Sequence, residues 1–360
     1  MQVTVLGAGL MGRLLAWRWA RSGACVTVLE RSAAAAPASA AHTAAAMIAP
    51  YSERAVADEQ VFQRGLRSLT LWPELLAQLH NDTGEHIAYG AAGTLLVAHR
   101  ADHALLQQCR QTFRHYGVEA ARWLDAQQLQ QLEPDLNGFS SGCWVSDEAH
   151  LDNRALLPAL QRAAERFGAQ YRFDSDVQMS NGQYQLHGQP LKADMLIDCR
   201  GTGARDWPHG ERPRAVRGEV CWIESTEVFL TRPVRLLHPR YSLYLVPKPS
   251  PPGRQRYILG ATEIETADSS PVSVRSALEM LSALYSLNPK LAEARVLQLD
   301  VNLRPAYADH IARFEQRHGA LCVNGLFRHG YLQAPALLEE MQQQLNWPLQ
   351  WPSSVQESLA

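Results

Sequence analysis

Residues 4–32 read TVLGAGLMGRLLAWRWARSGACVTVLERS, and this stretch decides the fold of the chain. Its first apolar run predicts a buried strand at 2–6, and the segment that follows predicts a helix over 10–22. Three glycines with the spacing GxGxxG stand between these two elements: Gly7, Gly9 and Gly12. Glycines at this place allow a tight turn and a close approach of the backbone to a diphosphate, which the N-terminus of the helix attracts.

The second apolar run, ACVTVL, ends in an acidic residue, Glu30. A carboxylate about 20 residues beyond the glycine turn accepts hydrogen bonds from the ribose hydroxyls of a bound dinucleotide. The glycine motif is weak by itself, but here it has the strand–turn–helix–strand context that the motif requires. The sequence therefore predicts a Rossmann-type dinucleotide-binding unit at the start of the chain.

Length and composition narrow the class of protein. A chain of 360 residues is long for one domain, so two domains are expected. The net charge is −2 with acids and bases interspersed, which argues against nucleic acid or an anionic membrane surface as a partner. No apolar run reaches the roughly 20 residues of a membrane span, and no charged region of a secretory signal precedes the first strand.

The cysteines and histidines predict neither disulfides nor a metal site. The six cysteines lie far apart without a CxxC motif, as expected for a reduced, cytoplasmic protein. The thirteen histidines show no ligand spacing with a third partner, so no metal is expected.

Strand-rich segments alternate along the chain with segments of the α/β type. This order predicts an α/β fold in which a Rossmann-type FAD-binding domain is intertwined with a strand-rich α+β substrate domain. The expected FAD-binding domain comprises residues 1–85, 150–213 and 301–360. The expected substrate-binding domain comprises residues 86–149 and 214–300.

Two later segments favour FAD over NAD as the dinucleotide. Residues 41–50 are rich in small side chains and follow the second strand directly, where a nicotinamide-binding unit would normally enter its next βα pair. The last strand ends at Gly325, and a loop leads to Gly330, where a helix is expected to begin. The N-terminus of such a helix would stabilise negative charge on the pyrimidine edge of reduced flavin.

With these residues in view, the chain resembles the glycine oxidase and D-amino-acid oxidase family of FAD-dependent amine oxidases. Within that family it is most similar to the glycine oxidases of thiamine biosynthesis. The resemblance covers nearly the whole chain through motifs in the family's order: GAGLMG…E, TAAAMIAP, GTLLVA, LEPDL, DEAHLDNRAL, YLVPKP…ILGATE, LRPAYADH and NGLFRHGYLQAP.

The resemblance implies the residues of the site. The substrate carboxylate would be bound by Arg304, assisted by Tyr244, with Arg328 as a second arginine near it; a guanidinium can bind a carboxylate bidentately. Without a family, Arg304 would suggest a surface ion pair and Tyr244 a core aromatic residue. The FAD contacts implied by position are Gly7, Gly9, Gly12, Glu30, Thr43, Ala44, Ala45, Met47, Val177 (through its backbone), Gly201, Gly330, Tyr331 and Leu332.

Two positions depart from the family pattern. Ala46 stands where the family has glycine, and the added methyl group could narrow the substrate space or alter access of oxygen. The strand end IDCRGTGA places Asp198, Cys199 and Arg200 near the expected cofactor, and whether Arg200 contacts the diphosphate stays open.

The resemblance implies an oxidase of glycine or a similar small amine, with hydride transfer from Cα to the flavin. Molecular oxygen would reoxidise the flavin to give hydrogen peroxide, and the imine would hydrolyse to a keto acid and ammonia. Two other functions stay open: a flavoprotein that oxidises side chains of a precursor protein in quinone-cofactor maturation, and a dehydrogenase that passes electrons to a carrier. The sequence does not decide which amine is the substrate or whether the chain forms a homo-oligomer.

Overall fold

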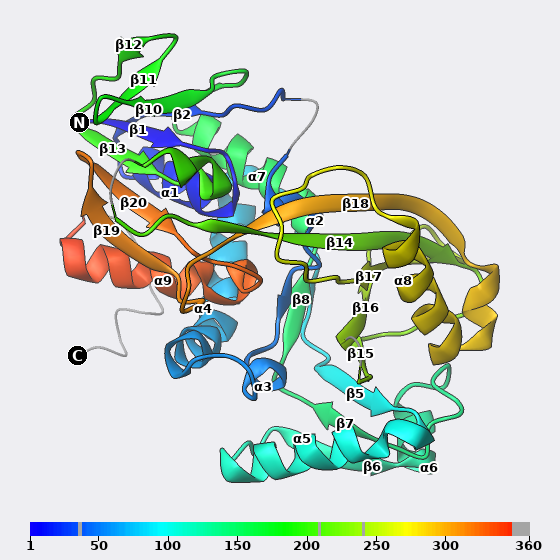
Figure 1. Cartoon of the computed structure of the whole chain (residues 1–360). Coiled ribbons are helices and arrows are strands. Elements are labelled where there is room, and N and C mark those ends of the chain that lie inside the picture. The colour runs from blue at the N-terminus through cyan, green and yellow to red at the C-terminus, as the bar shows by residue number, and fades with distance from the viewer. Residues whose placement is uncertain (35–37, 208–209, 240–241, 348–360) are drawn as a thin grey trace, which may run out of the picture.

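The start of the chain lies in the middle of a six-stranded sheet with the order β19-β20-β13-β1-β2-β9 (Figure 1). The computed structural model describes residues 1–34, 38–207, 210–239 and 242–347. The strands are parallel apart from β19, which runs antiparallel to β20. Their bounds are β1 (Gln2–Leu6), β2 (Cys25–Leu29), β9 (Gln170–Arg172), β13 (Met195–Asp198), β19 (Arg313–Arg317) and β20 (Ala320–Asn324).

The two faces of this sheet are covered by different elements. Alternation along β1 directs Val3 and Val5 into a large core formed with helices, whereas Leu6 belongs to a second core with Val177 and Tyr184 of a small antiparallel sheet. The helices are α1 (Leu10–Arg21), α4 (Glu59–Thr83), α7 (Asn153–Arg166) and α9 (Gly330–Leu345). The small sheet consists of β10 (Val177–Ser180), β11 (Gln183–Leu186) and β12 (Gln189–Pro190).

An eight-stranded sheet with the order β18-β14-β17-β16-β15-β5-β7-β6 forms the second part of the molecule. Its two longest strands, β14 and β18, run side by side from the first sheet towards α8 (Figure 1). The bounds are β5 (Thr94–Ala98), β6 (Ala121–Asp125), β7 (Ser141–Val145), β14 (Arg214–Ser225), β15 (Val234–Leu237), β16 (Ser242–Lys248), β17 (Gln255–Gly260) and β18 (Arg295–Ala306).

One face of the eight-stranded sheet packs against α8 (Val274–Leu287) and α6 (Ala126–Leu132). Part of the opposite face packs against α5 (His103–His115), which lies along β5, β7 and β6 in Figure 1. The rest of that face packs against Ala45 and Met47, which follow the Rossmann-type unit in the sequence. This contact joins the two large sheets.

A third small sheet, β3-β8-β4, lies where the chain passes between the two parts. The short helices α2 (Ala40–Thr43) and α3 (Pro50–Glu53) flank its first strand. The strands are β3 (Met47–Ile48), β4 (Tyr89–Gly90) and β8 (Ala149–Leu151).

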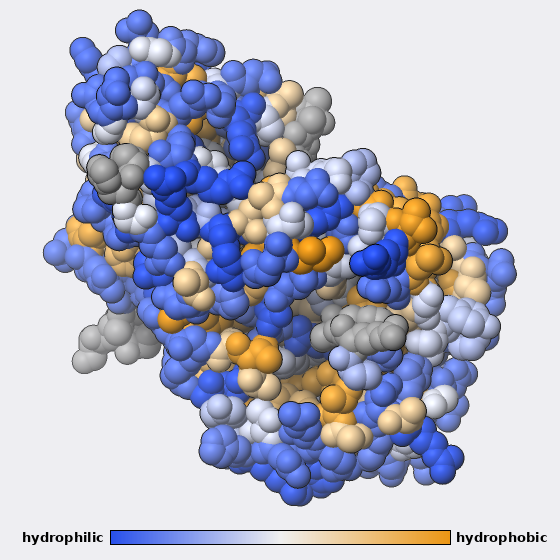
Figure 2. Space-filling view, viewed as in Figure 1, coloured by the Kyte–Doolittle hydropathy of each residue, from blue (hydrophilic) through white to orange (hydrophobic). Residues whose placement is uncertain are grey.

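The outer edge of the eight-stranded sheet is apolar and exposed. Val296, Leu297 and Leu299 of β18 are all more than 40 % exposed, and Figure 2 shows apolar surface over the outer part of β18 and α8. The pairing of β18 with β14 shifts register between Trp222 and Ile223. Such an irregularity hinders edge-to-edge pairing of sheets, which an apolar edge strand would otherwise favour.

The mixed α/β class predicted from the sequence is confirmed, and the first strand, helix and second strand lie where the glycine motif predicts them. Helix α4 begins at Glu59, because the Asp58 side chain accepts a hydrogen bond from Gln60 N and caps the helix. None of the described helices is both long and apolar enough to cross a membrane.

The domain boundaries stay a prediction. The boundary expected between residues 300 and 301 falls inside β18, and the boundary expected between residues 149 and 150 falls inside β8. Residues 348–360 of the expected FAD-binding domain lie outside the described residues.

Candidate active site

A cavity of about 1210 Å³ extends from the carboxyl ends of β1 and β2 to the face of the eight-stranded sheet. Fourteen of the sixteen predicted substrate and FAD contacts line it: Gly7, Gly9, Glu30, Thr43, Ala44, Ala45, Met47, Gly201, Tyr244, Arg304, Arg328, Gly330, Tyr331 and Leu332. Gly12 lies inside α1, and Val177 lines an adjoining cavity of about 490 Å³ that shares Gly7 and Glu30 with the first. The structure therefore places the predicted substrate-binding residues and the predicted FAD-binding residues around these two adjoining cavities, apart from Gly12.

The glycine turn after β1 has room only for glycine at two positions. Gly7 has φ +92°, and a Cβ there would lie 2.8 Å from the carbonyl oxygen of Cys199. A Cβ on Gly12 would lie 1.9 Å from the carbonyl oxygen of Gly7. Gly9 is the N-cap residue of α1, and a Cβ on it would have Ser39 Cβ as its nearest neighbour, at 3.9 Å, so the turn leaves an open cradle at the N-terminus of the helix. This geometry fits a dinucleotide diphosphate.

The carboxylate of Glu30 binds backbone on both sides of the cradle. It accepts hydrogen bonds from Ala8 N at 2.6 Å, from Ser32 N at 2.9 Å and from Ser32 Oγ at 2.8 Å. Glu30 therefore joins the glycine turn to the end of β2, a role that the sequence did not indicate. Its predicted contact with the ribose stays a prediction.

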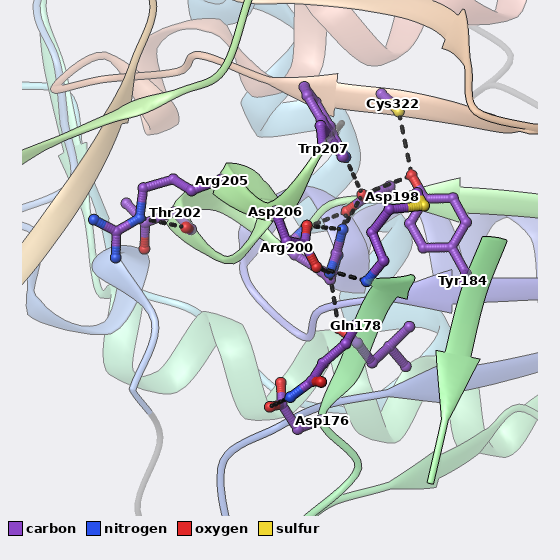
Figure 3. Close-up of polar contacts among 12 residues, drawn as sticks. Asp176, Gln178, Tyr184, Asp198, Arg200, Thr202, Arg205, Asp206, Trp207 and Cys322 are labelled. Atoms are coloured by element: carbon purple, nitrogen blue, oxygen red, sulfur yellow. Dashed lines mark hydrogen bonds and ion pairs between the residues drawn. The ribbon is translucent and has the colours of Figure 1, made fainter. Parts of the chain in front are cut away.

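Arg200 is fully engaged inside the protein, as Figure 3 shows. Its five N–H groups donate to both carboxylate oxygens of Asp198, to both of Asp206 and to the carbonyl of Val177. The buried Asp198 also accepts from Tyr184 Oη at 2.9 Å and from Trp207 Nε1 at 3.0 Å. A guanidinium has five N–H donors, and all five of Arg200 are used within the protein. None is therefore left to bind the diphosphate of a cofactor.

Helix α9 begins at Gly330 at the border of the cavity. A Cβ on Gly330 would meet no atom of the described residues within 4 Å, so the helix N-terminus faces open space. His329 lies directly before it; burial lowers the pKa of this imidazole to about 4, a shift that Arg328 and Arg235 strengthen and Glu53 opposes. His329 is therefore neutral at neutral pH.

The register of the eight-stranded sheet places Tyr244 on the face that borders the cavity. Tyr244 lies directly opposite Arg235 of β15 and opposite Gly260 of β17, and Arg235 lies opposite Leu96 of β5. Residues directly opposite one another in a sheet share a face, so Leu96, Arg235 and Tyr244 form one row along the cavity. A Cβ on Gly260 would lie 3.0 Å from Tyr244 Oη, so this glycine leaves room for the phenol.

Arg304 of β18 reaches the cavity over Gly218 of β14, where a Cβ would lie 2.4 Å from its Cζ atom. Its Nη1 donates to two backbone carbonyls, those of Thr262 at 3.0 Å and Arg217 at 3.3 Å. No carboxylate of the described residues lies within ion-pair distance of Arg304, and burial lowers the pKa of its guanidinium. A guanidinium in this state lacks a counter-ion, which an anionic ligand would supply.

Sequence reasoning missed a cluster of charges beside Arg304. Glu53 of α3 forms ion pairs with Arg235 and with Arg328, the latter at 2.8 Å, and Arg328 also binds the exposed Glu263 at 3.0 Å. Burial raises the pKa of Glu53, but the two arginines more than offset this and hold it well below its usual range. Arg328 lines the cavity with both terminal nitrogens engaged by carboxylates, and its role beside the substrate stays a prediction. In the sequence, this cluster is indicated only by Arg235, a charged residue within the apolar run VRLL.

Comparison with known proteins accounts for this arrangement. A family model described as FAD dependent oxidoreductase (DAO) matches residues 2–343. The chain belongs to this family. As a DAO-family enzyme it uses FAD, and the glycine cradle, the open N-terminus of α9 and the size of the cavity fit that cofactor.

Three proteins illustrate the likeness of this DAO-family chain to others. A Rhizobium etli protein named as a thiamine biosynthesis oxidoreductase, ThiO, is 38 % identical over 347 residues, 96 % of each chain. The solved glycine oxidase of Bacillus cereus has a TM-score of 0.79 and 23 % identity, covering 96 % of this chain and 94 % of its own. The solved FAD-bound L-α-glycerophosphate oxidase of Mycoplasma pneumoniae has a TM-score of 0.76 and 17 % identity, covering 98 % and 96 %. The family and cofactor expected from the sequence are confirmed.

Proposed function

We propose that this FAD-dependent oxidoreductase is an oxidase of glycine or of a similar small amino acid or secondary amine. The observation that carries the proposal is Arg304, a guanidinium that lines the cavity without a carboxylate partner among the described residues. Arg235 and Arg328 in the same cavity share the carboxylate of Glu53. One substrate carboxylate would therefore supply Arg304 with the counter-ion that no described residue gives it.

The described residues would bind and orient such a substrate. Arg304 would bind the carboxylate, and the Tyr244 hydroxyl, which burial keeps protonated by raising its pKa, would donate to the same group. FAD, when bound, supplies the acceptor for the hydride of Cα and passes the two electrons to oxygen as hydrogen peroxide. No side chain has to remove a proton if the amine arrives neutral, so the contribution of the protein is orientation and electrostatics. The imine would hydrolyse in water to a keto acid and ammonia.

Glycine is the first candidate among small amines because of the relatives. The ThiO-named relative is 38 % identical, and a Bacillus licheniformis protein named glycine oxidase is 24 % identical over 360 residues. We extend this to a role in thiamine biosynthesis. A cytoplasmic location is part of the same proposal and agrees with the six cysteines, which are all free.

Flavin reduction under anaerobic conditions tests the proposal with matched compounds. Glycine and sarcosine should bleach the flavin absorbance, whereas glycolate, which lacks the amine, and methylamine, which lacks the carboxylate, should not. In air, glycine should consume oxygen and release peroxide. Reduction by glycine without oxygen uptake would instead indicate a dehydrogenase, and reduction by methylamine as fast as by glycine would refute carboxylate recognition.

A further inference from the structure

Lys248, the last residue of β16, is a buried lysine, with only 4 % of its surface exposed. Its Nζ donates to the carbonyl of Ala45 at 2.7 Å and to the carbonyl of Leu151 at 2.8 Å, and it lies 3.4 Å from Asn153 Oδ1. No carboxylate among the described residues forms an ion pair with Lys248. All its close partners are neutral oxygens, so the role of this amine is to bind backbone.

Asn153, the first residue of α7, binds the same cavity-lining segment from another side. It is fully buried, and its Nδ2 donates to the carbonyls of Ala41 at 3.0 Å and His42 at 2.8 Å. Lys248 and Asn153 themselves do not line the cavity, whereas Ala41, His42 and Ala45 do. The two side chains therefore hold three carbonyls of the segment, and the carbonyl of Ala41 also accepts from Tyr331 Oη at 2.9 Å.

Fixing the carbonyl of Ala45 also fixes the next N–H group. In a trans peptide the C=O and the following N–H point in opposite directions, so the N–H of Ala46 points away from Lys248. Ala46 lines the cavity, and within the described residues its N–H has no acceptor. A backbone N–H held in this way is a hydrogen-bond donor ready for a ligand.

The strand that carries Lys248 also carries Tyr244. Tyr244, Val246 and Lys248 alternate along β16 and share one face. Val246 packs against Ala45 and belongs to the same cluster as Tyr244 and Met47. One strand face therefore contacts the 41–46 segment and presents a phenol to the cavity.

We infer that Lys248 and Asn153 are positioning residues for FAD: they orient the backbone of residues 41–46 so that the N–H of Ala46 donates to the bound flavin. They thereby connect the strand of Tyr244 to the cofactor. This inference requires that FAD is bound, which the family establishes, and it does not depend on which amine the enzyme oxidises.

Replacement of Lys248 by methionine in the full-length enzyme tests the inference. Methionine leaves the carbonyls of Ala45 and Leu151 without a donor, so the segment can turn. We expect the dissociation constant of FAD, measured by titrating the apoprotein, to rise at least tenfold, and the visible absorption bands of bound flavin to shift. Lys248→Gln should restore part of both, because an amide still donates. Lys192→Met and Lys290→Met, at the two other, exposed lysines, should match the parent.

A variant at Asn153 tests the inference even if Lys248→Met fails to fold. Asn153→Ser should also weaken FAD and shift the bands, and Lys248→Gln combined with Asn153→Ser should cost less than the product of the two single effects, since both act on one segment. The inference is overturned if Lys248→Gln and Asn153→Ser bind FAD within twofold of the parent. It is equally overturned if FAD affinity falls while the absorption bands stay those of the parent, because the lysine would then act on stability alone.

Discussion

Arg235 lies directly opposite Tyr244 on the neighbouring strand, so a partly buried guanidinium and a partly buried phenol border the same cavity side by side. Arg235 is neutralised by Glu53, whereas Arg304, on the other side of Tyr244 in the sheet order, has no such partner among the described residues. We therefore interpret Arg235 as part of a structural ion pair and propose Arg304 as the ligand-binding group.

Arg304→Ala should raise the dissociation constant of the substrate about 30-fold or more. Loss of a charge-assisted pair costs roughly 2–4 kcal/mol, and about 1.4 kcal/mol corresponds to a factor of ten. Anaerobic titration of flavin reduction measures this constant, and FAD content should remain that of the parent. Arg304→Lys should recover only part, because an ammonium supplies charge without the planar fork. A variant that binds glycine like the parent would show that Arg304 is not the carboxylate site.

Glu53→Gln should lower the free energy of unfolding by about 3 kcal/mol, because it leaves Arg235, whose side chain is only 13 % exposed, without its counter-ion. Glu263→Gln is the matched control: Glu263 is 43 % exposed and pairs with the same Arg328, so its loss should cost less than about 1 kcal/mol. Urea unfolding at saturating FAD measures both. Equal costs for the two variants would contradict the assignment of Glu53 as the buried partner.

Ala46→Gly should lower the free energy of unfolding by about 1–2 kcal/mol less than Ala45→Gly does. Both alanines are buried, but Ala46 has φ +54°, a conformation that is strained for a residue with a Cβ and free for glycine. The resemblance described in the sequence analysis implies glycine at this place, so we attribute the strain to the alanine found here. Thermal unfolding of the two variants checks the difference, and a larger loss for Ala46→Gly would mean that methyl packing outweighs backbone strain.

Lys248 should make the enzyme more stable as the pH rises from 7 to 10. Burial lowers the pKa of Lys248 to about 7 from 10.5, with Asp152 raising it and Arg154 lowering it. Between these values the unfolded chain binds more protons than the folded one, so stability increases with pH; below pH 7 the full penalty of the buried charge remains. Relative to Lys248→Met, the parent should gain about 2 kcal/mol between pH 7 and pH 9 in urea unfolding at saturating FAD. If the difference in unfolding free energy between the parent and Lys248→Met were the same at pH 7 and pH 9, the amine would be in contact with water.

Glu30→Ala should weaken FAD binding about tenfold. The carboxylate holds Ala8 N and Ser32 N on two sides of the cradle, and each charge-assisted hydrogen bond contributes on the order of 1 kcal/mol or more. Fluorescence titration of the apoprotein with FAD measures the change. Parent-like affinity would show that the cradle keeps its shape without Glu30.

The sequence predicted the elements that depend on local pattern. The glycine turn, the flanking strands and the start of α9 at Gly330 follow from spacing and from conformations that only glycine adopts easily. The positions of Tyr244 and Arg304 came from the family resemblance, and the structure places both at the cavity.

The residues that sequence reasoning missed depend on contacts between distant segments. Glu53 and Arg235 are 182 positions apart and meet because α3 lies over the face of β15 that borders the cavity. Lys248 looks ordinary in the motif YLVPKP, and only the packing of β16 against residues 41–46 directs its amine to Ala45. No local pattern encodes such pairs, because sheet register and chain crossing decide them.

The middle of the Rossmann-type sheet also determines when this protein can finish folding. β1 is made first, but its neighbour β13 ends at Asp198, and the next strand, β20, ends at Asn324. During synthesis on the ribosome the edge of this sheet beside β13 therefore stays open until β20 has been made, and an open edge invites association with other chains. The cavity expected to hold the cofactor is lined both by the turn after β1 and by the start of α9, so capture of the cofactor has to wait until α9 has been made.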